Sequence, residues 1–281
     1  MYRSLALSLV VAASCTAVPA CAQMLPAPSL NFPQVSAEGF TWGFSTGFDY
    51  ITGKYGANCA LRSLSLTCTT TGTTVFDIPM TGMVQFDRLR LEATVPWVDI
   101  EGPGKFAGIF GAPIVVAPAN NEPKHRSGFG DITAGAALIV SREDIVLPRF
   151  EVEGIVKLPT ASDGLGTGKT DYGAQLNLFK TVLPGLTAFG SFGYLWIGDI
   201  NSIRLHSGAR ATAGAEFKFF SASVGGLLDY RQSAWEGSPD YFALDPYAKW
   251  EVFAGIGVGV YGTFGMTHST PSSGFGVRLT L

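Results

Sequence analysis

The first candidate for chemistry is a glycine-rich stretch that resembles a nucleotide-binding loop. Ser162 to Asp171 reads SDGLGTGKTD and contains Gly168-Lys169-Thr170. A phosphate-binding loop of this kind also needs a glycine five positions before Gly168, because its backbone N–H groups must converge on the phosphates. Asp163 occupies that position, and the residues after Asp171 alternate with a period of two instead of opening a helix. The stretch therefore predicts a flexible hairpin loop and not a nucleotide site.

A serine and histidine pair is the second candidate, since the two side chains can act as nucleophile and general base. The chain has three histidines, His125, His206 and His268. His206 directly precedes Ser207, and adjacent residues on a strand point to opposite faces. That pair cannot bring its two side chains together, so the sequence predicts that the protein is not an enzyme.

The cysteines are the third candidate. Cys15 and Cys21 lie within the export signal described below, which leaves Cys59 and Cys68. Outside the cytosol two nearby thiols tend to be oxidised, and closing so short a ring is worth about 2 to 3 kcal/mol by chain entropy. We expect a Cys59–Cys68 disulfide, and metal binding is less favoured because neither cysteine has a histidine or carboxylate within a few residues.

Composition limits the classes of partner. The chain has 281 residues, of which 47% are hydrophobic and only 15% are charged, with a formal net charge of -3. Soluble domains carry about 25% charged residues, so much of this surface faces something other than water. A small negative net charge predicts no nucleic-acid partner, and no motif indicates a cofactor.

The first residues predict export from the cytosol. Arg3 precedes an apolar run from Leu5 to Ala13, and Ala20-Cys21-Ala22 provides the small residues of a cleavage site before Gln23. We predict a signal peptide over residues 1–22, followed by a short periplasmic segment over residues 23–36. A lipoprotein acylated at Cys21 is the less favoured alternative.

The rest of the chain alternates with a period of two. In the first segment Phe40, Trp42 and Phe44 share one parity, while Thr41 and Ser45 share the other. No later window reaches the roughly 20 apolar residues of a spanning helix, and the alternating segments are about 9 to 13 residues long, close to a membrane-crossing strand. We expect about twelve strands, beginning near Phe40, Thr74, Leu89, Asp131, Arg149, Asp171, Leu186, His206, Ala222, Leu244, Gly255 and Gly274.

The connections alternate between long and short, as outer-membrane barrels require. Long loops are expected at 52–73, 100–130, 159–170, 198–205, 232–243 and 265–273, and tight turns at 87–88, 142–148, 180–185, 219–221 and 252–254. The predicted fold is all-β: a transmembrane antiparallel up-and-down β-barrel over residues 37–281, with short periplasmic turns and long extracellular loops. In the second loop, Pro113 and Pro118 argue against a regular strand, leaving a solvated loop or a partial plug.

The candidate site consists of charged residues at the alternate strand positions that are expected to face the barrel interior. A charge on the lipid face costs about 2 to 4 kcal/mol at the membrane midplane, so these side chains are expected to line the lumen as ion pairs of nearly balanced sign. The lumen-lining residues predicted from parity are Arg90, Glu92, Asp131, Glu151, Glu153, Lys157, Gln175, Asn177, Arg210, Glu216, Lys218, Asp229, Arg231, Asp245, Lys249, Glu251 and Arg278.

Three stretches carry a family resemblance: SGFGDITAGAALIV, EVEGIVKLPTASDGLGTGKTDYGAQLNLF and FGSFGYLWIG. Together they resemble the outer-membrane transporter family associated with the meta-cleavage pathway of phenol degradation, in which Gly-x-Gly-Asp begins one strand and Lys-Leu-Pro-Thr ends another before a glycine-rich loop and Asp-Tyr. The resemblance spans Ser127 to Gly198. It implies a barrel of this size that passes small compounds, aromatic ones included, and it transfers no set of binding residues.

The sequence thus predicts a channel in the outer membrane of a Gram-negative bacterium that passes small solutes through a narrow, charge-lined lumen. A structural or adhesion barrel without an open pore is the alternative, and a barrel-borne lipid hydrolase is less favoured. The expected partners are outer-membrane lipid, the barrel-assembly machinery during insertion, and an unidentified small solute.

Overall fold

A computed structural model describes most of the chain after residue 39. The described residues are 40–53, 57–62, 65–70, 73–103, 105–109, 112–116, 123–162, 165–198, 205–234, 240–253, 255–267 and 270–281. The predicted signal peptide and the segment over residues 23–36 lie outside them. Within the described residues, no helix is both long and apolar enough to cross a membrane.

The main sheet is a closed wall of antiparallel strands. Its strands are β1 (Phe40–Gly53), β4 (Thr73–Phe86), β5 (Leu89–Pro103), β8 (Pro123–Phe129), β9 (Thr133–Ser141), β10 (Arg149–Lys157), β11 (Asp171–Leu183), β12 (Leu186–Trp196), β13 (Gly208–Phe219), β14 (Ala222–Arg231), β15 (Tyr241–Phe253), β16 (Ile256–Gly265) and β17 (Ser273–Thr280). Neighbours in the chain are neighbours in the wall, and β1 pairs with both β4 and β17, which closes the barrel. Because β8 and β9 are successive parts of one crossing, the thirteen strands make twelve crossings, and the predicted up-and-down barrel is confirmed.

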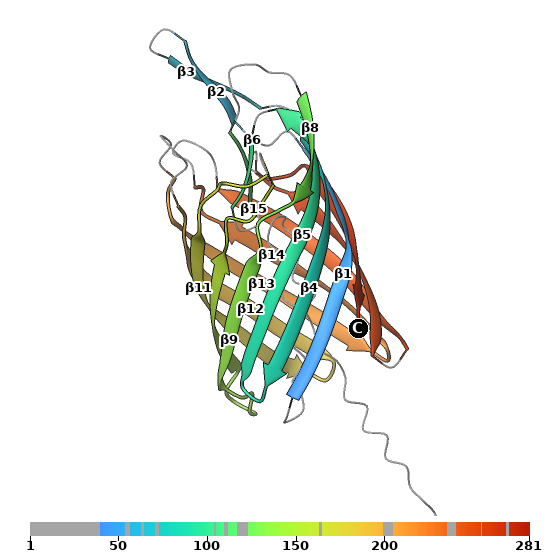
Figure 1. Cartoon of the computed structure of the whole chain (residues 1–281). Helices are drawn as coiled ribbons and strands as arrows, with labels where there is room; N and C mark the ends of the chain where they lie inside the picture. Colours follow the sequence, from blue (N-terminus) through green and yellow to red (C-terminus); the bar gives the residue numbers. More distant parts are fainter. Residues whose placement is uncertain are drawn as a thin grey trace, which may run out of the picture.

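The connections divide as the sequence predicts. Short turns join β4 to β5, β9 to β10, β11 to β12, β13 to β14 and β15 to β16 at one end of the barrel, and the C-terminus lies toward that end (Figure 1). The longer connections meet at the opposite end, where the β2–β3 hairpin rises above the rim. Most strand starts are within a residue or two of the prediction, including Phe40, Arg149 and Asp171.

The two longest connections contain strands that the sequence analysis missed. The first carries the hairpin β2 (Ala57–Arg62) and β3 (Ser65–Thr70), and the second carries the hairpin β6 (Lys105–Ile109) and β7 (Ala112–Val116). The prediction that Pro113 prevents a regular strand was wrong. Both strands of an isolated hairpin are edges, and proline is tolerated on an edge because its missing N–H can face outward.

The crossing predicted to begin at Asp131 is instead interrupted there. The upper part of β5, from Trp97 to Pro103, pairs with β8, whereas its lower part, from Leu89 to Thr94, pairs with β9. The change of partner occurs at Pro96, which has no N–H to donate, although its carbonyl accepts a 2.9 Å bond from the Gly130 N–H. A β-bulge follows, and it places Asp131 between the two strand segments.

Alternation sorts the side chains as expected from parity. On β1, Phe40, Trp42 and Phe44 are exposed, while Ser45 and Asp49 are buried. On β5, Leu89 and Leu91 are exposed and Arg90 is buried. Apolar side chains therefore cover the outside of the wall, and polar ones face the interior, the arrangement of a barrel surrounded by lipid.

Candidate functional site

The interior contains a network of charged side chains on β5 and β10, which we call the ion ladder (Arg90, Glu92, Arg149, Glu151 and Glu153). Arg90 Nη1 lies 3.1 Å from Glu151 Oε2, and Arg149 Nε lies 3.1 Å from Glu151 Oε1. Glu92 extends the ladder with an oxygen 3.6 Å from Arg90 Nε. The buried Glu151 carboxylate thus bridges two guanidinium groups, one on its own strand β10 and one on β5, with β9 between the two strands.

The ladder continues upward through amides. Gln175 and Asn177, both on β11, each donate a 2.8 Å hydrogen bond to Glu153 Oε2 on β10. Gln175 also donates to Asn177 Oδ1 at 3.1 Å. Because Gln175 and Asn177 are two residues apart on one strand, their side chains share the inner face. The amides neutralise no charge but give Glu153 two donors that water would otherwise supply.

A second cluster joins the first and last strands of the barrel. Arg278 on β17 binds Asp49 on β1 in a bidentate pair, with Nη1 to Oδ1 at 2.6 Å and Nη2 to Oδ2 at 2.5 Å. The Tyr261 hydroxyl on β16 donates to the same carboxylate. Asp77 on β4 lies directly across from Asp49 in the strand register.

The wall from β13 to β15 holds further pairs. Lys249 Nζ lies 2.5 Å from Glu216 Oε2, which also accepts a 2.9 Å bond from the Tyr247 hydroxyl. Asp229 and Arg231, two residues apart on β14, form an ion pair. Charges of both signs thus occur on this wall too, which agrees with the balance expected from the sequence.

Aromatic rings accompany the cations inside the barrel. The guanidinium of Arg149 lies 4.3 Å from the Phe179 ring centre, and that of Arg278 lies 5.4 Å from the Tyr261 ring centre. Two further cation–ring pairs are Arg231 with Tyr241, at 4.8 Å, and Lys249 with Tyr247, at 5.4 Å. All four rings are buried.

Several of these rings belong to an apolar cluster on the inner faces of β11, β12 and β14 to β16. Its members are Phe179, Phe189, Leu227, Tyr247 and Tyr261. This apolar cluster borders the ion ladder where Arg149 lies over the Phe179 ring.

Glycines at the inward parity make room for the rings. A Cβ added at Gly214 would lie 2.5 Å from the Phe189 ring, and one at Gly276 would lie 2.4 Å from the Tyr261 ring. Both distances are shorter than real Cβ contacts allow, so a ring occupies the space that a side chain would need. Part of the high glycine content of the strands is thus explained by packing inside the barrel.

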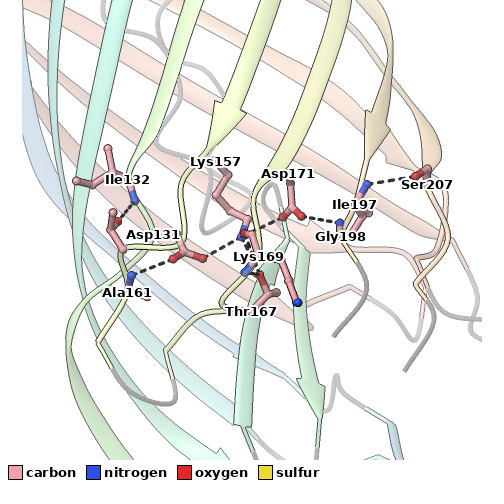
Figure 2. Close-up of polar contacts among 11 residues, drawn as sticks. Asp131, Ile132, Lys157, Ala161, Thr167, Lys169, Asp171, Ile197, Gly198 and Ser207 are labelled. Atoms are coloured by element: carbon pink, nitrogen blue, oxygen red, sulfur yellow. Dashed lines mark hydrogen bonds and ion pairs between the residues drawn. The ribbon is translucent and has the colours of Figure 1, made fainter. Parts of the chain in front are cut away.

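At the long-loop end, Lys157 forms the most completely buried ion cluster (Figure 2). Its Nζ lies 2.9 Å from Asp131 Oδ2 and 3.0 Å from Asp171 Oδ2, and all three side chains are 0% exposed. Asp131 comes from the bulge between β8 and β9, and Lys157 and Asp171 are opposite each other at the ends of β10 and β11. One cation thus holds three strand ends together.

The same cluster fastens the loop between β10 and β11. Lys157 Nζ donates to Thr167 Oγ1 at 2.9 Å and to the Lys169 carbonyl at 3.0 Å, and the Ala161 N–H donates to Asp131 Oδ1 at 2.9 Å. Figure 2 shows these loop residues gathered around the Lys157 ammonium. The loop expected over 159–170 is thus tied to the interior at Ala161, Thr167 and Lys169, because buried charges need hydrogen-bond partners.

The structure brings most of the predicted lumen residues into the interior. The buried ones are Arg90, Asp131, Glu151, Glu153, Lys157, Asn177, Arg210, Glu216, Asp229, Arg231, Asp245 and Arg278. Glu92, Gln175 and Lys249 are partly buried, whereas Lys218 and Glu251 are exposed near the short-turn end of their strands, outside the clusters described above.

Sequence reasoning missed eight interior side chains that belong to the ion clusters and cation–ring pairs. They are Asp49, Asp77, Arg149, Asp171, Phe179, Tyr241, Tyr247 and Tyr261. Each lies at the inward parity of its strand, so a strict application of the period of two would have found them. The tyrosines were missed because inward residues were sought among charged and amide side chains.

The remaining candidates for chemistry are the cysteines and the histidines. Cys59 and Cys68 are Cα partners in the β2–β3 hairpin. The structure describes their backbone only, so the predicted disulfide stays a prediction. His125 Nε2 lies 2.9 Å from Asp99 Oδ2 at an exposed position, and His206 is exposed while Ser207 Oγ accepts a 3.2 Å bond from the Ile197 N–H. His268 lies outside the described residues.

Comparison with known proteins gives a matching family model and a solved structure of similar fold. Residues 69–280 match the family model described as "Putative MetA-pathway of phenol degradation". The COG4313 outer membrane channel of Pseudomonas putida F1 is similar in fold, with a TM-score of 0.64, 13% sequence identity, and coverage of 87% of this chain and 95% of that chain. The toluene transporter TbuX of Ralstonia pickettii gives a TM-score of 0.42 at 10% identity, with coverage of 87% and 88%, which is too low to support an argument. No curated protein matches the chain.

Proposed function

The chain belongs to the family described as putative MetA-pathway of phenol degradation, and from this premise we propose that it is an outer-membrane channel for small aromatic compounds that carry a polar substituent. The observation that carries the proposal is the set of four buried cation–ring pairs inside the barrel. The proposal includes export by a signal peptide over residues 1–22, cleaved after Ala22.

The chemistry of these pairs suits such a solute. A cation over an aromatic face is stabilised by about 0.5 to 2 kcal/mol, depending on how far the pair is removed from water. A solute ring can take the place of a protein ring beside Arg149 or Lys249, and a hydroxyl or carboxylate on that ring can pair with the cation itself. Each exchange replaces one favourable contact by a similar one, so a solute is held weakly and can move on.

The burial of the interior side chains limits the size of any solute. Arg90, Glu153 and Arg278 are each less than 10% exposed, whereas a wide water-filled pore would leave long charged side chains hydrated. A twelve-stranded barrel lies between barrels filled by side chains and the open porins of 16 to 18 strands. Passage therefore proceeds by local displacement of Arg and Lys side chains, which selects for narrow, flat solutes.

Liposome swelling with matched solutes tests the proposal. Benzoate and cyclohexanecarboxylate share a six-membered ring and a carboxylate, but only benzoate has a π face. We expect the purified protein to admit benzoate faster than cyclohexanecarboxylate and to admit glucose poorly.

A substitution pair ties the selectivity to the interior. Phe179→Leu removes the ring that competes with the solute for Arg149 and should raise benzoate entry by about twofold to fivefold, the equivalent of about 0.5 to 1 kcal/mol for one cation–π contact. Phe192→Leu is the matched control, because Phe192 faces outward on β12 and is exposed. Equal rates for benzoate and cyclohexanecarboxylate in the wild type would overturn the proposal.

A barrel without an open pore is the second candidate, and the same burial of interior side chains favours it. Swelling separates the two: if none of the three solutes enters liposomes that contain folded protein, the structural barrel stands and the channel does not.

A further inference from the structure

Four aliphatic side chains form an apolar patch on the inner wall at the long-loop end, which we call the mouth patch (Ile51, Val75, Val98 and Ile100). Ile51, Val75 and Ile100 are successive Cα partners across β1, β4 and β5, so they form one row. All four are at most 2% exposed. The patch stands out because the neighbouring inward positions carry charged side chains such as Asp49 and Asp77.

The loop between β10 and β11 covers the mouth patch. Its Leu165 belongs to the same buried cluster and is 1% exposed, and its partly buried Ala161 packs against the cluster. Three crossings, β8–β9, β5 and β4, separate β10 from β1. Leu165 lies beside Gly128 of β8, the register partner of Val98, because a Cβ added at Gly128 would be 3.3 Å from Leu165 Cδ1. Leu165 therefore reaches along the inner wall, past β8, to strands that do not pair with β10 or β11.

Leu165 and the loop are held by separate contacts. The Leu165 N–H donates to the Ser162 carbonyl at 3.0 Å, and the Ser162 N–H donates to the Phe129 carbonyl at 2.8 Å. The loop itself is anchored by Thr167 and the Lys169 carbonyl, both bound to Lys157. The Leu165 side chain is thus attached to the mouth patch by apolar contact alone, while polar contacts fix the residues around it.

A leucine side chain inserted from a loop is chemically a small hydrocarbon in an apolar site. Its burial is favourable in proportion to the apolar area removed from water, and a solute ring offers a comparable area. The driving force is not directional, so a ring can replace the isobutyl group without reproducing any particular contact.

We propose that the mouth patch is a binding site for the apolar ring of an incoming solute, and that Leu165 occupies this site when no solute is present. The inference rests on the proposed function for the kind of solute, and it adds the place where the solute first binds. A solute that displaces Leu165 sits directly above Asp49 and Asp77, at the top of the polar interior.

Direct binding of p-cresol to the protein in lipid nanodiscs tests the site without relying on transport. Saturation-transfer NMR reports contact of the cresol ring with the protein, and a titration gives the half-saturating concentration. Leu165→Ala removes the competing side chain and should lower that concentration about tenfold. Val98→Thr keeps the side-chain volume but adds a hydroxyl to the patch, and it should raise the concentration severalfold.

Two controls keep the result specific. Leu183→Ala makes the same change at the exposed end of β11 and should leave cresol binding unaltered. Each variant must also retain the heat-sensitive gel mobility of the folded barrel. If Leu165→Ala and Val98→Thr both bind p-cresol as the wild type does, the mouth patch is not the site.

The outcomes also separate this inference from the proposed function. If benzoate enters liposomes selectively while the Leu165 and Val98 variants bind p-cresol as the wild type does, the proposed channel function is supported and the proposed mouth site is excluded. If no solute enters liposomes while the two variants shift p-cresol binding in opposite directions, the mouth site is supported and the channel function is excluded.

Discussion

Lys157 shows what a single buried charge does in this barrel. Its ammonium is the shared counter-charge of Asp131 and Asp171, and none of the three side chains reaches water. Lys157→Met keeps most of the stem but leaves two buried carboxylates facing each other. Removing one partner from a buried pair costs about 3 to 5 kcal/mol, and we expect a loss of this size in urea unfolding of the protein in detergent micelles.

The control for this prediction is Lys169→Met. Lys169 is exposed and contributes its backbone carbonyl to the cluster, which the substitution leaves in place. Equal stability of the two variants would mean that the Lys157 cluster contributes nothing to the fold.

Gly276 is a position where a single added carbon would meet interior side chains. Its Cβ would lie 2.3 Å from Asp49 Oδ1 and 2.4 Å from the Tyr261 ring. Gly276→Ala should push the ring away and destabilise the barrel by about 1 to 3 kcal/mol, the usual cost of overpacking. Near-ultraviolet circular dichroism should show a changed tyrosine signal. Gly82→Ala is the control, because a Cβ there meets no atom within 4 Å, and an equal effect of both would contradict the packing argument.

At the scale of single residues, parity alone predicted most of the inward charges. Arg90 and Glu151 were identified because a charge on the lipid face is too costly to occur at random. Their partners were not predictable, since which side chains meet depends on strand register. The fit of the Tyr261 ring over Gly276 was also hidden, because it joins two strands at a particular level and leaves no local pattern in the sequence.

The turn between β13 and β14 contains a residue in a left-handed conformation. Phe220 has a φ of 50° and is 99% exposed. A residue with a Cβ loses roughly 1 to 2 kcal/mol in this region relative to glycine. Phe220→Gly should therefore raise the free energy of unfolding by about 1 kcal/mol, measured by urea titration in micelles. Phe220→Ala removes the ring but keeps the Cβ, so a gain from that variant as well would assign the effect to the ring.

The β2–β3 hairpin places Cys59 and Cys68 opposite each other in register. We predict that the two cysteines form a disulfide in the exported protein. Alkylation of the denatured chain should add two adducts after reduction and none before it, as read by mass spectrometry. Adducts formed without a reductant would show that the thiols are free.

Among the elements, the membrane-crossing strands were predictable and the extra hairpins were not. Strands such as β10 alternate cleanly because lipid and the interior impose opposite requirements on successive residues. The β6–β7 hairpin is a separate two-stranded sheet outside the barrel wall, and Pro113 misled the prediction. The change of strand partner at Pro96 was not predicted either, because Pro96 fits the alternation of an ordinary strand.

For the molecule as a whole, the packed interior predicts a low conductance. Long charged side chains inside the wall are buried, Arg90, Lys157 and Arg278 among them. In planar bilayers we expect steps at least about tenfold smaller than those of an open 16-stranded porin in the same lipid. Large, stable steps from the wild-type protein would show that the interior opens on its own.

The Arg278 and Asp49 pair has a consequence for the order in which the barrel folds and closes. These residues are 229 positions apart, whereas every other neighbouring pair of crossings in the wall is adjacent along the chain. Their bond can form only after the final strand has emerged and met the first. A chain that stops before Arg278 keeps both an unpaired strand edge and an uncompensated carboxylate, and these two defects distinguish unfinished copies from finished ones.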